Sequence, residues 1–487
     1  MLKNPEEYKR SLKEMKPNIY KFGELIEDVT THPATKRTVE GHSRIYALAM
    51  DPRYQELLTT TSSLTGERIS RYLSIMGSAE DMIANTRIKR LLFNVTGTCT
   101  GGRCGGWNGI NAMWPTTFEL DKKSGTGYHG RLKKWLAEAQ GNDITMSVAL
   151  TDPKGDRTLK PSQQDDPDMS LRMVEERDDG IVVRGAKIMI CGVAAANEVF
   201  VMPGVAYGEA DRNYAISFAI PRDAEGIRCV ETTHPSDRRE LEEGFDNPVG
   251  CGITQSYVLF EDVFVPKERV FLAGEHKSTL SAIMNFIAPY RASMGGCVAG
   301  QGDVMVGASI LIAWANGLSE KVFREKLTQM IINNETTFGM GVAAAVMGES
   351  HPSGSWTTNQ LLANVNKLHI ATLPYETKRL AQEIGGGIAE TGCIPSYKDI
   401  SNSDYGDLVQ KYLKAAAPAE ARVRVARLIE WLTVGAGIPG CMHGGGSPDG
   451  AKLVIQRTAE FDRCVGMAME LAGIEEGQIT PPSRNPS

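Results

Sequence analysis

Apolar and polar residues follow two different periods along this chain. Between residues 78 and 95, in "SAEDMIANTRIKRLLFNV", apolar residues recur at roughly helical spacing and Ser78 is a plausible N-cap. The stretch "GRLKKWLAEAQGND" predicts a second, shorter helix that Gly141 and Asn142 end. We therefore expect residues 1–145 to form an N-terminal helical domain.

The pattern changes to short alternating strands between about residues 146 and 275. Stretches such as "DDGIVVRGAKIMICG", "RNYAISFAIPRD" and "SYVLFEDVFVPKERVFL" are rich in β-branched and aromatic residues and are cut by Pro, Gly and Asp. This pattern predicts a central antiparallel β domain over residues 146–275.

Long helices are predicted again from about residue 276. "GDVMVGASILIAWANGL" and "AEARVRVARLIEWLTVGAG" have broad apolar faces, whose Met and Ala stripes are more typical of core packing than of a cofactor site. We expect a C-terminal helical bundle over residues 276–487, with a disordered tail from about residue 480. The predicted fold class is α+β.

Composition excludes some partners and favours one compartment. The 487-residue chain carries a net charge of −6, which gives no electrostatic reason to bind nucleic acid or an anionic membrane. The charged N-terminus is unlike a signal peptide, and no run of eighteen apolar residues predicts a transmembrane helix. Nine scattered cysteines do not form a secreted disulfide framework, so we expect a cytoplasmic protein.

Three cysteines raise the question of a metal site. In "TGTCTGGRCGGWNG", Cys99 and Cys104 lie five apart around a Gly-Gly pair, and Cys297 follows much later in "YRASMGGCVAG". Residues five apart do not share a helix face, so this pair converges only if it lies in a loop. Thiolates select zinc or iron–sulfur clusters, although three small core residues explain the same pattern.

Three Gly-containing segments are candidates for binding a flavin or a phosphate. The turn "ALTDPKGDR" combines the Thr151 hydroxyl with the planar Arg157 cation, which suits a flavin carbonyl or a pyrophosphate, or is simply a surface turn. Cys191 and Gly192 end a strand where a glycine admits a planar ring or forms a β-bulge. The glycines of "CMHGGGSPDG" do not match a dinucleotide fingerprint, yet their N–H groups can accept phosphate.

Seen together, these segments resemble the 4-hydroxybutyryl-CoA dehydratase branch of the 4-hydroxyphenylacetate 3-hydroxylase family. The matching stretches include "TTFELDKKSGTGYH", "ALTDPKGDRTLKPSQQDDPD", "ERDDGIVVRGAKIMICG", "GGCVAGQGDVMVGA" and "MHGGGSP", and the resemblance covers nearly the whole chain. It implies an acyl-CoA dehydrogenase-like fold, FAD bound between the β domain and the C-terminal bundle, and a homotetramer.

The resemblance also implies roles for individual residues. Three cysteines fall where the dehydratase holds a [4Fe–4S] cluster, namely Cys99, Cys104 and Cys297. The flavin contacts that it implies are Thr151, Asp156, Arg157, Cys191, Gly192, His443, Gly444, Gly445 and Gly446.

Several positions depart from the dehydratase pattern. The first cysteine pair is one residue wider, and Tyr290 stands where the family has its histidine ligand. Four further proton-handling positions are changed, namely Cys191, Gln255, Met294 and Val298. The candidate catalytic residues are His129, Cys191 and Tyr290, with His129 as a general base or substrate contact. Tyr290, His129 or an exogenous group are the candidates for a fourth cluster ligand.

Three functions remain open from the sequence. The first is a FAD enzyme, with or without an iron–sulfur cluster, that dehydrates, isomerises or desaturates an acyl-CoA thioester. The second is a two-component flavin hydroxylase of an aromatic phenol. The third is a non-catalytic flavoprotein that has lost its reactive groups. Cluster content discriminates the first from the second, and turnover of a thioester or a phenol excludes the third.

Overall fold

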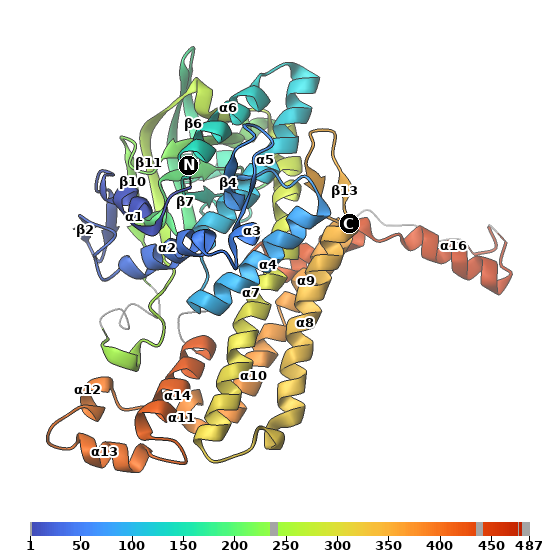
Figure 1. Ribbon diagram of the computed structural model, residues 1–487. Helices are drawn as coiled ribbons and strands as arrows, with labels where there is room; N and C mark the ends of the chain where they lie inside the picture. The colour runs from blue at the N-terminus through green and yellow to red at the C-terminus, as the bar shows by residue number, and fades with distance from the viewer. Residues whose placement is uncertain (1, 234–241, 435–441, 476, 480–487) are drawn as a thin grey trace.

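The computed structural model describes residues 2–233, 242–434, 442–475 and 477–479, and it combines helices with two larger sheets (Figure 1). The N-terminal region contains α1 (Pro5–Lys13), β1 (Ile19–Lys21), β2 (Glu24–Ile26), α2 (Lys36–Met50), α3 (Gln55–Leu58), β3 (Thr59–Thr61), β4 (Arg68–Ser70), α4 (Ala79–Thr96), α5 (Gly101–Ser124) and α6 (Tyr128–Gly141). The predicted N-cap is confirmed, because the Ser78 hydroxyl accepts a hydrogen bond from the Asp81 N–H at 3.2 Å.

The middle of the chain forms most of the two sheets. Its strands are β5 (Met146–Ala149), β6 (Arg172–Arg177), β7 (Gly180–Cys191), β8 (Glu198–Val201), β9 (Ile216–Pro221), β10 (Ile227–Glu231), β11 (Gln255–Pro266) and β12 (Val270–Ala273). One sheet has the order β2-β1-β10-β11-β7-β6 and the other the order β12-β9-β8-β5. Together with the flanking helices, these sheets confirm the predicted α+β class.

The sequence predicted antiparallel strands, but the sheets also contain parallel pairs. β1 pairs with β10 in parallel, and β5 pairs with β8 in parallel. β1 and β2 lie in the segment that was predicted to be helical. Each has only three residues, which is too short to show an alternating pattern in the sequence. The strand β1 forms by pairing with the distant strand β10.

The remaining helices surround one long central helix. They are α7 (Thr279–Ala315), α8 (Arg324–Val346), α9 (Gln360–Ile370), α10 (Leu373–Gly385), α11 (Gly387–Glu390), α12 (Tyr397–Ile400), α13 (Gly406–Leu413), α14 (Ala419–Thr433), α15 (Pro448–Thr458) and α16 (Phe461–Ala472), with the short hairpin β13 (Glu349–Ser350) and β14 (Trp356–Thr357) after α8. The predicted disordered tail lies outside the described residues. The domain limits at residues 145 and 275 stay predictions.

Helix α7 is the core of this arrangement, with α4, α8, α9 and α10 packed along it (Figure 1). The segment His276–Ala315 is long and apolar enough to cross a membrane, but 67% of its most apolar window is buried inside the protein. A buried core helix has the same composition, and α7 has that role, because other helices pack along it.

Candidate functional site

Four thiols gather where the N-terminal helices, the six-stranded sheet and α7 meet. Cys99 precedes α5, Cys104 lies in its first turn, Cys191 ends β7 and Cys297 lies in α7. A side chain at Gly101 would meet Cys191 Cβ at 2.9 Å and Cys99 Sγ at 3.3 Å, so these two cysteines face each other across that glycine. Burial raises the pKa of Cys99, and the neighbouring Cys104, Cys297 and Cys191 raise it further.

The loop predicted between Cys99 and Cys104 is replaced by a helix start. Gly101 and Gly102 form the first turn of α5, and only Cys99 lies outside it. The two cysteines approach because the chain turns before the helix begins. Within the described residues, no group of three or more His, Cys, Asp or Glu side chains is arranged to hold a single metal ion.

Tyr290 lies against this thiol site on α7. Burial, and then the four nearby thiols, raise the pKa of Tyr290 well above its usual value. The Lys89 ammonium lies 4.8 Å from the centre of the Tyr290 ring. Tyr290 is therefore a protonated, desolvated phenol beside a cation.

His42 is a further buried group at the thiol site. Its Nδ1 lies 2.8 Å from the Thr38 carbonyl oxygen, and its Nε2 has no hydrogen-bond partner among the described residues. Side chains at Gly102 or Gly192 would meet this imidazole at 3.0–3.1 Å. Burial lowers the pKa of His42 to about 4, so the ring is neutral and its Nε2 is a ligating or accepting nitrogen.

A buried ion pair anchors the turn that was predicted to contact a flavin. Asp152 and Lys187 meet at 2.6 Å, and the Tyr207 hydroxyl donates to Asp152 at 2.9 Å. The backbone of Thr151 is bound to β7, because its carbonyl accepts from the Ile188 N–H. This pairing holds the turn at the edge of the sheet.

The far end of the same turn is exposed. Asp156 accepts hydrogen bonds from the Thr158 N–H and hydroxyl, which lower its pKa. The side chains of Lys154 and Arg157 project into solvent and form no ion pair with the described residues. Two unpaired cations on an anchored turn suit an anionic ligand.

Gly192 lets the backbone of helix α5 approach the end of β7 closely, and its contact with a flavin stays a prediction. Its φ of +70° is left-handed, and a Cβ there would meet the backbone of Gly102 at 3.0 Å. The close approach that this glycine permits is therefore that of helix α5 to the end of β7. The adjacent Cys191 thiol accepts a hydrogen bond from the Gln255 amide at 3.3 Å.

The glycine turn 443–446 reaches the thiol site from the C-terminal end. The Gly446 N–H donates to the His443 carbonyl, and Gly445 (φ +69°) lies close to the Tyr290 ring. Two cations hold the turn: Arg291 donates to the Gly445 carbonyl at 2.8 Å and Lys367 to the Gly444 carbonyl at 2.6 Å. The predicted glycine cluster and Tyr290 thus lie together.

His129 lies apart from the thiols. Its Nδ1 is 3.0 Å from the Thr117 hydroxyl, and its ring packs against Trp114 and Phe118. Thr117 is thirteen residues beyond Cys104 on α5, or about 20 Å along the helix axis. His129 is therefore not placed to ligate a cluster held by these cysteines.

Two family models match nearly the whole chain. The model "4-hydroxyphenylacetate 3-hydroxylase N terminal" matches residues 4–272, and "4-hydroxyphenylacetate 3-hydroxylase C terminal" matches residues 281–473. The chain belongs to the 4-hydroxyphenylacetate 3-hydroxylase family.

Within this family, the chain is similar to a dehydratase. It is 38% identical to the 4-hydroxybutyryl-CoA dehydratase/vinylacetyl-CoA-Δ-isomerase of Clostridium aminobutyricum, over 98% of this chain and 100% of that protein. It superimposes on an oxygen-tolerant archaeal 4-hydroxybutyryl-CoA dehydratase from N. maritimus with a TM-score of 0.95 and 34% identity, covering 100% of this chain and 98% of the other.

Hydroxylases of the family are less similar in sequence. The oxygenase component of 4-hydroxyphenylacetate 3-monooxygenase from Thermus thermophilus is 26% identical over 88% of this chain and 87% of that protein. A structure of such a component with FAD and 4-hydroxyphenylacetate has a TM-score of 0.82, covering 96% of this chain and 99% of the other, at 23% identity. That likeness supports the fold alone.

Sequence reasoning missed three residues at this family member's site. Lys89 is one polar residue within the periodic pattern of α4, and His42 in α2 belongs to no recognisable motif. Asp152 was interpreted only as part of a turn. The available signal was a lysine or a histidine on the buried face of a predicted helix. From a single sequence, such a residue cannot be distinguished from one on a solvent-exposed face.

Proposed function

We propose that this chain is a flavin-dependent enzyme that acts on an acyl-CoA thioester by dehydration or double-bond isomerisation. The observation that carries the proposal is full-length identity of 38% to a dehydratase/isomerase, together with the presence of Cys99, Cys104 and Cys297 in one site. The similarity to the more distant hydroxylases supports the same fold for this chain, but it does not support a hydroxylase reaction.

FAD is the proposed flavin. The turn 151–157 offers the unpaired Lys154 and Arg157 cations and the Thr151 hydroxyl, a donor set that fits an anionic diphosphate or the polar edge of a flavin. The glycine turn 443–446 lies against Tyr290, beside the thiol site. When bound, a flavin would supply the redox step, and these residues would hold and orient it.

A [4Fe–4S] cluster is the proposed partner of the flavin. Thiolates are the ligands that such clusters prefer, and this site adds a fourth thiol, Cys191, to the three predicted ones. The phenolic oxygen of Tyr290 is a hard ligand that suits a cluster iron poorly. We therefore propose Cys191 or the neutral His42 nitrogen, rather than Tyr290, as the fourth protein ligand. Ligands of a cluster need not surround a single point, because its iron atoms occupy several positions.

The altered residues change how protons are handled. Gln255 does not titrate and holds the Cys191 thiol, while Met294 and Val298 are buried in an apolar cluster with Ile370. The acid–base groups of the dehydratase pattern are therefore replaced by neutral ones, and other side chains of this chain must polarise the thioester.

A homotetramer in the cytoplasm is the proposed state. Helix α16 projects from the body and has no buried residue among its twelve (Figure 1). Its exposed side chains include Phe461, Val465 and Leu471, the last 90% exposed. A helix with this much exposed apolar surface is typical of an arm that packs on another copy.

Anaerobic purification followed by iron, sulfide and flavin analysis tests the proposal. About four irons and one flavin per chain would support the dehydratase chemistry, and Cys99→Ala should then lose most of the iron. Flavin without iron would favour the second candidate, a hydroxylase fed with reduced flavin. Absence of both cofactors after reconstitution would exclude this enzyme class.

A further inference from the structure

Cys191 and Gln255 are direct partners at the edge of the thiol site. They face each other in register between β7 and β11, and the Gln255 amide donates to the Cys191 sulfur at 3.3 Å. Both belong to the positions that depart from the dehydratase pattern. Because the two residues meet in one contact, these two departures form a single chemical unit, a thiol with an amide N–H directed at its sulfur.

Three thiols converge on Gly101 at the start of α5. A Cβ at Gly101 would lie 2.9 Å from the Cys191 Cβ and 3.3 Å from the Cys99 sulfur. The Cys104 thiol donates to the Gly101 carbonyl at 3.5 Å. Since glycine has no side chain, it leaves the space between these thiols open. Cysteines from two distant segments of the chain therefore share one centre.

Cys297 completes the group from α7. It lies two turns after Tyr290, and therefore on a similar face of that helix. All four thiols are close enough to the Tyr290 hydroxyl to raise its pKa. A [4Fe–4S] cluster has four irons, and four cysteine thiolates are its usual ligand set. The thiols at this site therefore match the irons of the proposed cluster one to one.

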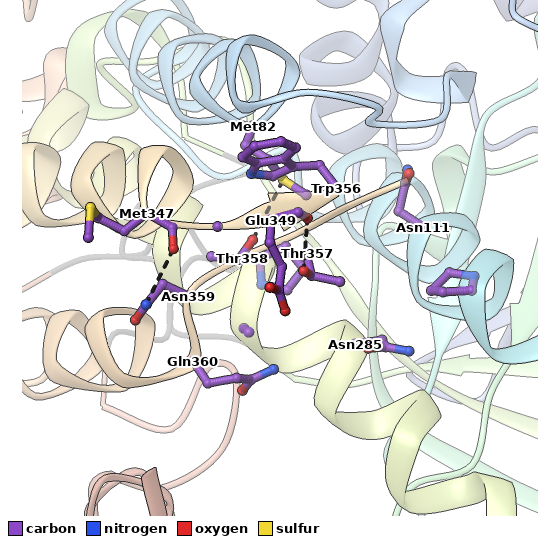
Figure 2. Close-up of a pocket in the computed structure, with 14 residues that line it drawn as sticks. Met82, Asn111, Asn285, Met347, Glu349, Trp356, Thr357, Thr358, Asn359 and Gln360 are labelled. Atoms are coloured by element: carbon purple, nitrogen blue, oxygen red, sulfur yellow. Dashed lines mark hydrogen bonds between the residues drawn. The ribbon is translucent and has the colours of Figure 1, made fainter. Parts of the chain in front are cut away.

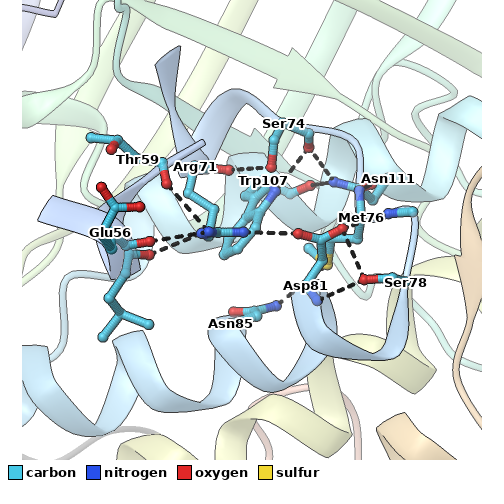
Figure 3. A network of polar contacts seen from close by, with 12 residues as sticks. Glu56, Thr59, Arg71, Ser74, Met76, Ser78, Asp81, Asn85, Trp107 and Asn111 are labelled. Carbon is cyan, nitrogen blue, oxygen red and sulfur yellow. Dashed lines mark hydrogen bonds and ion pairs between the residues drawn. The ribbon is translucent and has the colours of Figure 1, made fainter. Parts of the chain in front are cut away.

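Helix α5 holds Cys104 in a fixed frame (Figure 3). Trp107, about one turn after Cys104, donates its indole N–H to the Ser74 carbonyl at 2.9 Å. The Asn111 amide donates to the same carbonyl at 3.0 Å. A cysteine that is held by packing and by such hydrogen bonds keeps the geometry of a ligand before the cluster binds.

His42 lies on a different side of α5 from the thiols. Consecutive residues of an α-helix point about 100° apart. Gly101 faces the thiols, whereas a Cβ at Gly102 would meet the His42 Nε2 at 3.0 Å. The backbone of Gly192 lies against the same imidazole ring. His42 therefore fills the space between two glycine backbones, and Cys191 is the better placed of the two candidate ligands.

A cavity of about 440 Å³ between α4, α5 and α7 gives no support to an exogenous fourth ligand (Figure 2). Met82, Asn111 and Pro289 are among the described residues that line it, and none of the four cysteines is. A small molecule bound in that cavity would therefore not lie against the sulfurs.

We infer that Cys191 is the fourth ligand of the proposed cluster and that Gln255 is the hydrogen-bond donor to its sulfur. An N–H donor at a ligating sulfur stabilises the thiolate charge and raises the reduction potential of the cluster. The isosteric glutamate would instead place a second negative charge beside that sulfur. This inference rests on the proposed function, because it assigns a ligand to the cluster proposed there.

Iron content and electron paramagnetic resonance spectra of cysteine variants test the ligand. Cys191→Ala, purified anaerobically, should retain about three of the four irons and show the spectrum of a three-iron cluster after mild oxidation. Cys191→Ser, whose hydroxyl can ligate iron, should retain more iron than Cys191→Ala. Cys229→Ala removes a buried thiol of β10 outside the site, and this matched control should keep the wild-type spectrum.

A redox titration of the cluster tests the hydrogen-bond donor. Gln255→Glu at alkaline pH should favour the oxidised cluster at least about tenfold, which is roughly 59 mV for one electron. Gln255→Met removes the donor without adding a charge, so it should shift the potential in the same direction by less. An unchanged potential in Gln255→Glu would overturn the role of Gln255.

The iron analyses decide between the ligand and the cluster. Wild-type iron content with an unchanged spectrum in Cys191→Ala overturns the ligand and leaves the proposed function standing. Loss of iron from His42→Ala but not from Cys191→Ala also overturns it, because the imidazole is then the ligand. Equal loss of iron from Cys191→Ala and Cys229→Ala overturns it too, since the loss is then structural. Wild-type protein that binds no iron after reconstitution overturns the proposed cluster and this inference together.

Discussion

Glu231 is a buried acid whose ionisation should set part of the pH dependence of stability. It ends β10, is 4% exposed and accepts a hydrogen bond from the Ser256 hydroxyl at 2.7 Å. Burial raises its pKa to about 7 from an ordinary value of 4.5. The folded protein therefore holds a proton that the unfolded chain releases between about pH 4.5 and 7.

Stability from this group is present below pH 4.5 and is lost as pH rises through 7. We expect Glu231→Gln, which mimics the neutral acid, to gain roughly 3 kcal/mol over wild type at pH 8 and little at pH 4.5. Urea unfolding at several pH values measures this difference. Parallel pH profiles for the two proteins would contradict the assignment.

The Asp152–Lys187 pair offers a second residue-scale prediction. Asp152→Ala leaves the Lys187 ammonium buried without its counter-ion, so it should lose about 3–5 kcal/mol of unfolding free energy. Replacing both residues, in Asp152→Ala/Lys187→Met, should recover much of that loss. A double variant no more stable than Asp152→Ala alone would show that the pair is not the cause.

At the scale of elements, glycines decide how closely α4 approaches α7. A Cβ at Gly296 would lie 2.0 Å from the Thr86 carbonyl oxygen, and one at Gly300 would lie 2.4 Å from the Arg90 carbonyl oxygen. Both contacts are with backbone, which cannot rotate away. These two glycines therefore set the helix spacing that brings Lys89 to Ser293.

We expect Gly296→Ala to destabilise the fold by about 1–3 kcal/mol through overpacking. Gly307→Ala, in the same helix with no atom within 4 Å, should instead stabilise it by up to about 1 kcal/mol through helix propensity. Thermal unfolding of the two variants compares them directly. Similar shifts for both would mean that α4 moves away at little cost.

The periodicity of the sequence predicted the helices and strands better than the tertiary contacts between them. α4, α6 and β7 each carry a long local signal, and their caps or turns agree with the structure. The thiol site could not be predicted as a geometry, because tertiary packing alone brings Cys191 and Cys297 to Cys99. Lys89 was missed for the same reason: its partner Ser293 is 204 residues away.

For the whole molecule, α16 should determine assembly. None of its apolar side chains is buried in the single chain, so a charge at Val465 should oppose packing on another copy (Figure 1). We expect Val465→Asp to convert the proposed tetramer to smaller species in light scattering, with an unchanged circular dichroism spectrum. A wild-type monomer, or an intact Val465→Asp tetramer, would contradict this role.

The central claim is that this chain removes a proton from an acyl-CoA thioester at the thiol site. The most direct measurement incubates the anaerobic, cofactor-loaded protein with vinylacetyl-CoA in D₂O and follows product and deuterium by mass spectrometry. The account predicts but-2-enoyl-CoA that carries deuterium, and much less of it from Cys99→Ala. Unchanged, undeuterated vinylacetyl-CoA, with hydroxylation of a phenol when reduced flavin and oxygen are supplied, would contradict it.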